Sequence, residues 1–188
     1  KNAKKGKAKE RYFAIKTSQR IAKLPIDLQQ AFLFLIKQEY LRLSKYTQRN
    51  SAGLLNQALL EQNLPLTEMK WLEILHIGYV VEGAGYDYLD FDDKNNQILL
   101  VEAKSTERDS LFIHLSEPER RHIVEYMSKQ FSDENPNASW RMLLKTNDQY
   151  VDVTDVIKKI VLKHHEEYST IDSNMKAKDW VIEGALIA

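Results

Sequence analysis

Three ionisable residues, Asp87, Glu102 and Lys104, have types and spacing that could carry out metal-assisted chemistry. They fall in two segments, 85–91 and 98–105, which read as β-strands joined by a polar turn. Side chains two positions apart on a strand share a face, so Glu102 and Lys104 point the same way. Two carboxylates and a lysine that converge at the end of a hairpin can hold a hard divalent cation and position a water.

The length of the turn decides whether Asp87 joins the other two residues. Residues directly opposite each other in an antiparallel pair share a face. A two-residue loop at 94–95 sets Asp87 opposite Glu102. A two-residue loop at 95–96 sets it opposite Lys104 instead. A three-residue loop would turn Asp87 to the other face, so the hypothesis requires a turn with an even number of residues.

Hydrophobic spacing predicts the elements that must position these residues. We expect helices over residues 27–45, 54–59, 68–76, 117–131 and 155–165, and strands over 78–81, 85–91, 98–105, 111–115 and 140–145. Residues 179–182 fit either a short edge strand or a helix end. Helices followed by strands and two further helices indicate a mixed α/β core with an N-terminal helical lobe. The expected divisions are a basic arm at 1–24, a helical lobe at 25–64, a core at 65–170 and a C-terminal tail at 171–188.

Length and composition narrow the class of protein. The chain has 188 residues, 43% hydrophobic and 29% charged, which is enough for one domain with a real core. The longest apolar run, 31–36, is far shorter than the ~18 residues that span a bilayer, so we expect no membrane segment. No apolar stretch follows the basic N-terminus, as a secretory signal would require. The chain lacks cysteine, which excludes disulfides and thiolate metal sites and fits a cytoplasmic location.

Positive charge is concentrated at the N-terminus. Residues 1–23 carry a net charge of +8, so the remainder of this neutral chain carries −8. A basic arm on an acidic body is suited to contacting nucleic-acid phosphates, although a solvated or disordered tail would have the same composition. The candidates for this contact are Lys4, Lys5, Lys7, Lys9 and Arg11.

The order of Asp87 followed by Glu102-Ala103-Lys104 on a strand resembles the PD-(D/E)XK nuclease superfamily. More narrowly, the patterns G-Y-D-x-x-x-F-D, V-E-A-K-S and L-S-x-x-E resemble the domain at the C-terminus of the plant NO VEIN protein. Related domains occur in some bacterial restriction endonucleases. The resemblance covers residues 68–145.

The resemblance implies a restriction-endonuclease-like fold, with a mixed β-sheet core flanked by helices. It also implies a Mg²⁺- or Mn²⁺-dependent endonuclease that hydrolyses phosphodiester bonds in DNA, in restriction or anti-phage defence. Asp87, Glu102 and the Ala103 carbonyl would bind the metal. Lys104 would orient or help to deprotonate a water, or neutralise the phosphate. DNA would be the partner, and a homodimer or larger defence complex would supply a second active site.

Simpler interpretations exist for every residue of the motif. Glu102 and Lys104 could form a solvent-facing ion-pair strip on an edge strand, and Asp87 could be a turn residue. The whole domain could then be a catalytically inactive nuclease-fold module for nucleic-acid binding or complex assembly. A structure-selective nuclease would use the same residues on another substrate.

Three further acids could lie near a metal. Glu68 and Glu73 fall on the helix that Thr67 is expected to cap, where a solvated helix face is at least as good an explanation. Glu119 stands three residues after Ser116, the spacing of a capping box, and we favour that role over a place beside a metal.

Overall fold

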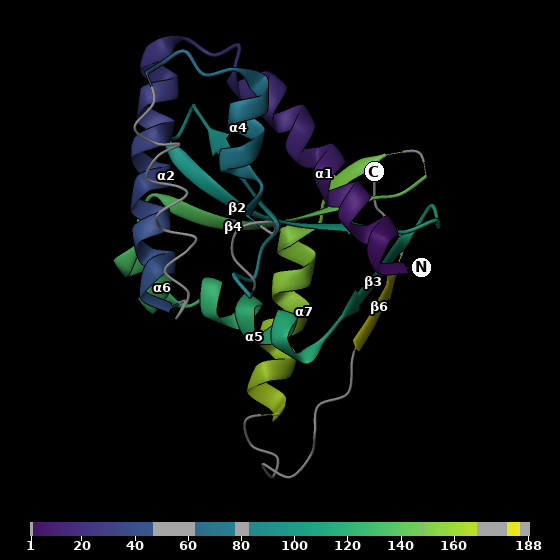
Figure 1. Ribbon diagram of the computed structural model, residues 1–188. Coiled ribbons are helices and arrows are strands. Elements are labelled where there is room, and N and C mark those ends of the chain that lie inside the picture. The colour runs from purple at the N-terminus through teal and green to yellow at the C-terminus, as the bar shows by residue number, and fades with distance from the viewer. Residues whose placement is uncertain (1, 47–62, 78–82, 148, 169–179, 185–188) are drawn as a thin grey trace. The chain divides into compact units, whose positions relative to one another are not determined.

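A computed structural model describes residues 2–46, 63–77, 83–147, 149–168 and 180–184 of the chain (Figure 1). By its internal contacts the chain divides into two units: unit 1 comprises residues 1–101 and 137–139, and unit 2 comprises residues 102–136 and 140–188. The short helix expected at 54–59 and the strand expected at 78–81 lie outside the described residues.

Unit 1 contains the N-terminal helices and the hairpin. Its elements are α1 (Asn2–Ile21), α2 (Ile26–Tyr46), α4 (Glu68–Leu75), β1 (Tyr88–Asp92) and the first part of β2 (Gln97–Ser105). The Thr67 hydroxyl accepts a hydrogen bond from the Lys70 N–H (3.2 Å), so the predicted N-cap of α4 is confirmed.

The segment expected as a basic arm is a helix that contributes to the core of unit 1. Phe13, Ala14 and Ile21 are buried on one side of α1, which packs against α4 and β1. The Phe13 ring stacks on Tyr88 of β1, with 6.3 Å between ring centroids. This apolar side holds the C-terminal half of the helix in place, although its lysines dominate the composition.

Aromatic side chains link α2, α4 and β1. The Phe32 ring of α2 stacks on Trp71 of α4, with centroids 5.8 Å apart, and on Phe91 of β1, with centroids 4.8 Å apart. All three residues are almost fully buried. Stacking of this kind adds to the free energy gained by burying apolar area, so these rings fix the hairpin against the helices.

The hairpin joins β1 to β2 in antiparallel register. Tyr88 pairs with Val101 and Asp92 pairs with Gln97, which leaves a four-residue loop, 93–96. The number of loop residues is even, as the hypothesis of a shared face requires. This register is the one that a loop centred on residues 94–95 predicts.

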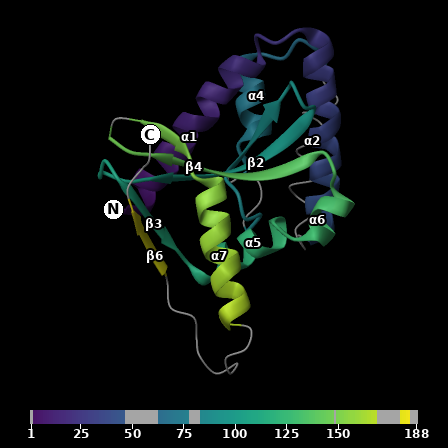
Figure 2. The same ribbon diagram turned by 180° about the vertical axis from the view of Figure 1, so that it is seen from behind.

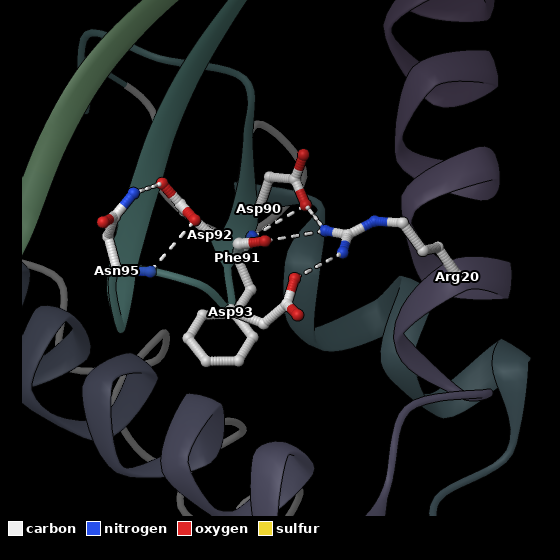
Figure 3. Close-up of polar contacts among 6 residues, drawn as sticks. All are labelled: Arg20, Asp90, Phe91, Asp92, Asp93 and Asn95. Atoms are coloured by element: carbon white, nitrogen blue, oxygen red, sulfur yellow. Dashed lines mark hydrogen bonds and ion pairs between the residues drawn. The ribbon is translucent and has the colours of Figure 1, made fainter.

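Local hydrogen bonds shape the turn. The backbone and side-chain nitrogens of Asn95 donate to the two carboxylate oxygens of Asp92, at 3.2 and 2.8 Å (Figure 3). Asn96 has a positive φ of 49°, a conformation that asparagine adopts more readily than most residues. The polar residues that separate the two strands are therefore the ones that close the hairpin.

Unit 2 contains the remaining elements. They are the end of β2, β3 (Leu111–Leu115), α5 (Glu117–Tyr126), α6 (Lys129–Glu134), most of β4 (Ala138–Lys145), β5 (Tyr150–Asp152), α7 (Thr154–Tyr168) and β6 (Trp180–Gly184). Strand β6 pairs antiparallel with β3, with Ile182 opposite Ile113, and Figure 2 shows this pair from behind. For the described residues 180–182, the strand alternative is therefore the correct one.

The single helix expected over 117–131 is wrong. Helix α5 ends at its C-cap, Met127, and α6 begins after Ser128, whose hydroxyl accepts a hydrogen bond from the Phe131 N–H (3.1 Å). A serine side chain that binds the backbone in this way starts a new helix instead of continuing the old one.

Four strands form a mixed sheet in the order β1-β2-β4-β5. The Ile98 N–H donates to the Asn137 carbonyl (2.8 Å), and the Thr106 N–H donates to the Lys145 carbonyl (2.9 Å). The two bonded pairs have the same separation along the chain, so residue numbers rise in the same direction on both strands and β2 and β4 run parallel. Strands β1 and β5 run antiparallel to their neighbours. The expected mixed α/β class, with a mixed sheet flanked by helices, is confirmed.

Among the described residues, no helix has both the length and the apolar character needed to cross a membrane.

Candidate active site

Lys104 lies between two carboxylates in unit 2. Its Nζ contacts Oε1 of Glu119 and lies 3.3 Å from Oε1 of Glu102. Glu102 and Lys104 are two positions apart on β2, so their shared face, predicted from strand geometry, brings them together. Glu119 comes from the first turn of α5. The side chains of Lys104 and Glu102 are only 20% and 13% exposed, which argues against a simple solvent-facing strip.

Glu119 has two roles at the start of α5. Its backbone N–H donates to the Ser116 hydroxyl (3.4 Å), and its Oε2 accepts from the Ser116 N–H (2.6 Å). The predicted capping box is therefore confirmed. The other carboxylate oxygen of Glu119 contacts Lys104, a tertiary contact that the sequence did not predict.

The ion pairs shift the pKa values of Lys104 and Glu119. Burial lowers the pKa of Lys104, but the Glu102 and Glu119 carboxylates outweigh burial and raise that pKa above its ordinary value. Burial raises the pKa of Glu119, but the Lys104 ammonium and the hydrogen bonds from Ser116 outweigh it, so the pKa falls. Lys104 is thus held as an ammonium. It can donate hydrogen bonds and neutralise negative charge, but it is poorly suited to removing a proton from a water.

Asp87 belongs to unit 1 and lies just before the first residue of β1, although we expected the strand to begin at residue 85. Its N–H donates to the carbonyl oxygen of Val101 (2.8 Å), yet Val101 is already opposite Tyr88 in the register. Asp87 lies in a bend just before β1 begins at Tyr88, so the two-residue alternation of a strand does not extend to it. The turn has the required length, but the strand ends one residue short of Asp87, and the place of Asp87 beside Glu102 and Lys104 stays a prediction.

The residues on either side of Asp87 are fixed within unit 1. The Tyr86 hydroxyl donates to Oε1 of Glu39 on α2 (2.8 Å), and Glu39 is also paired with Arg42. On the other side, Tyr88 stacks on α1. Burial, followed by the carboxylates of Asp90 and Asp87, raises the pKa of Tyr88. Asp87, itself half-buried, therefore lies on an anchored stretch of backbone.

The remaining predicted acids, Glu68 and Glu73, belong to unit 1. Glu68 and Glu73 are both exposed on α4, as expected of a solvated helix face. No group of three or more carboxylate or imidazole side chains suited to a metal ion is found within the described residues. The donor types at Asp87, Glu102 and the Ala103 carbonyl are nevertheless the oxygen ligands that Mg²⁺ prefers.

The basic residues of the N-terminus lie on α1. For Lys4, Lys5, Lys7 and Lys9, the described structure gives the backbone, and Arg11 is exposed. Arg20, near the end of the helix, is tied to the hairpin instead. Its Nη2 lies 2.5 Å from Oδ1 of Asp90 and 2.8 Å from the Phe91 carbonyl, and its Nη1 lies 3.6 Å from Asp93 (Figure 3).

Arg120 is a buried basic residue whose structural role the sequence did not reveal. It is 6% exposed; its Nη1 donates to the Leu115 carbonyl (3.0 Å), and its guanidinium lies over the Trp180 ring at 4.5 Å. Its position one residue after Glu119 gives no indication of this burial, because the contact depends on strand β6.

Comparisons with family models, curated proteins and solved structures find no match to this chain.

Proposed function

We propose that this chain is a Mg²⁺-dependent DNA endonuclease that hydrolyses phosphodiester bonds in restriction or anti-phage defence. The observation that supports the proposal is the position of Lys104, held as an ammonium beside Glu102 on β2 and Glu119 on α5. A half-buried cation next to a carboxylate suits a site that must accept a phosphate and a divalent metal together.

The proposed division of labour follows from the donor types. The carboxylates of Asp87 and Glu102 and the carbonyl of Ala103 would hold Mg²⁺, which keeps several of its waters and needs few protein ligands. When bound, the cation would lower the pKa of a water and offset negative charge on the phosphate. Lys104, as a hydrogen-bond donor, would orient that water or neutralise a phosphate oxygen.

Plasmid cleavage tests the catalytic assignment. With Mg²⁺ or Mn²⁺, we expect the wild-type protein to cut DNA, and Lys104→Ala to reduce the rate by about 10²-fold or more, as loss of a charge-stabilising donor does elsewhere. Lys129→Ala, which removes an exposed lysine from α6, is the matched control and should cut normally. Circular dichroism of each variant separates loss of chemistry from loss of folding.

Two outcomes would contradict the assignment. One is a wild-type protein that cuts no DNA or RNA under any divalent-ion condition. The other is a folded Lys104→Ala variant that cuts as well as the wild type. Cutting of both strands would further imply a homodimer or a partner subunit, which sedimentation of the active species would reveal.

A catalytically inactive module is the second candidate, and one observation favours it. The contacts of Lys104 with Glu102 and Glu119 form an ion-pair network that neutralises its charge without any ligand. Metal titration separates the two functions. Binding of DNA or a protein partner without any divalent-ion binding would favour the inactive module.

A further inference from the structure

Basic residues recur along one side of α1. Lys5, Lys9, Tyr12, Lys16 and Arg20 follow one another at intervals of four, three, four and four residues, which keeps all five positions on one face of a helix. We propose that this face, here called the α1 ridge, binds the phosphate backbone of a nucleic-acid duplex. The inference rests on the proposed function for its substrate class, DNA, and assigns the surface that binds it.

The other side of α1 fixes the ridge in place. Phe13, Ala14 and Ile21 are buried in unit 1, whereas Tyr12 and Lys16 are exposed. The Lys16 Nζ lies 4.9 Å from the centre of the Tyr12 ring, a cation–π contact that keeps the ammonium close to the helix surface. The basic positions therefore belong to a helix whose orientation within unit 1 is set by its core side.

Arg20 is the last residue of the row, but its side chain binds the hairpin of unit 1. Its guanidinium is engaged by Asp90, Asp93 and the Phe91 carbonyl (Figure 3). These contacts tie the C-terminal end of the helix to the hairpin. The ridge proper therefore consists of Lys5, Lys9 and Lys16, with Tyr12 among them.

The basic residues of the α1 ridge do not stabilise the helix on which they lie. Lys5 and Lys9 are a like-charged pair four residues apart, which destabilises a helix. The first turn of α1 contains no acidic residue to complement the positive end of the helix dipole. A polyanion along the ridge would relieve both unfavourable terms, because it supplies negative charge at the spacing of the lysines.

Geometry and chemistry favour a duplex over a lipid surface. From Lys5 to Lys16 the helix rises about 16 Å, roughly five base-pair steps of B-form DNA. A membrane-surface helix needs an exposed apolar face, but the apolar side of α1 is occupied by the core of unit 1. Contacts to phosphates alone carry no sequence information, so the ridge would position the duplex without selecting its sequence.

Salt-dependent binding tests the ridge. The wild-type protein, Lys16→Gln and Lys9→Gln are titrated against a labelled DNA duplex in a chelator, at several salt concentrations. Each substitution should reduce the slope of log affinity against log salt by about 0.9, the value for one lost phosphate contact. Lys37→Gln, which makes the same charge change at an exposed position on α2, should keep the wild-type slope. Lys16→Arg should also keep it.

The outcomes separate the ridge from the nuclease assignment. Unchanged slopes in both ridge variants, with plasmid cleavage intact, would overturn the ridge and leave the nuclease standing. Reduced slopes in a protein that never cleaves DNA would support the ridge and contradict the nuclease. Tighter binding to phosphatidylserine vesicles than to the duplex, lost in Lys16→Gln, would also overturn the ridge as a nucleic-acid surface.

Discussion

Lys104 is the residue at which structure and proposed chemistry meet. Removing an ammonium from water is costly, and the two carboxylates beside Lys104 offset that cost while keeping it charged. Glu119 couples this charge to the start of α5, because the same carboxylate completes the capping box. The position of the lysine therefore depends on a helix terminus as well as on its own strand.

The lowered pKa of Glu119 predicts an acid-sensitive contribution to stability. A carboxyl with a folded-state pKa below its ordinary value of 4.5 stabilises the fold fully above 4.5, and loses that contribution as the pH falls through the folded value. The free energy of unfolding should therefore drop between about pH 5 and pH 3 more steeply in the wild type than in Glu119→Gln. Urea titrations across this range measure the difference, and parallel pH profiles for the two proteins would contradict it.

A double-mutant cycle isolates the ion pair between Lys104 and Glu119. Glutamine can still complete a capping box, so Glu119→Gln removes the charge while sparing the cap. We expect a coupling energy of about 0.5–3 kcal/mol between Lys104→Gln and Glu119→Gln in urea unfolding, as for residues in direct contact. Ser116→Ala, which removes the hydroxyl half of the cap, should cost about 1 kcal/mol. Additive effects of the two charge changes would show that the contact contributes nothing to stability.

At the scale of elements, α1 is held mainly by its apolar side. Ile21 is fully buried, so Ile21→Ala should cost about 2–5 kcal/mol of unfolding free energy. Arg20 is 43% exposed, so Arg20→Ala should cost less, about 1 kcal/mol or below, despite its contacts with the hairpin. Chemical denaturation of the two variants measures the order of the effects. A larger loss in Arg20→Ala would mean that the polar contacts anchor the helix.

The starts of helices were predicted best, because capping side chains mark them locally. The contacts between elements were predicted worst. Thr67 and Ser116 marked helix starts because a cap acts within one turn of its own residue. The α1 helix escaped detection because lysines obscure the spacing of its few apolar residues. The bend at Asp87 depends on how the chain reaches Val101, and the pairing of Lys104 with Glu119 depends on where α5 begins in space. Neither is encoded in a local pattern.

At the scale of the whole molecule, the charge asymmetry has a structural basis. The +8 segment at residues 1–23 includes a helix that is part of unit 1, and its polar end is tied to acids of the hairpin. A concentration of positive charge is thus carried by a helix of unit 1. Such a surface raises the rate at which a polyanion is encountered, and this effect weakens as salt is added.

Metal binding should appear in the stability of the whole chain. A ligand that binds only the folded state stabilises it by about 2.7 kcal/mol at a hundredfold excess over its dissociation constant. For a chain of this length that is a rise in melting temperature of roughly 5–10 °C. We expect Mn²⁺ to produce this rise in the wild type but not in Asp87→Asn or Glu102→Gln. Glu73→Gln, which alters an exposed acid on α4, should keep the full shift. A full shift in Glu102→Gln would refute the metal assignment, whereas its loss in Glu73→Gln would bring the α4 acid into the site.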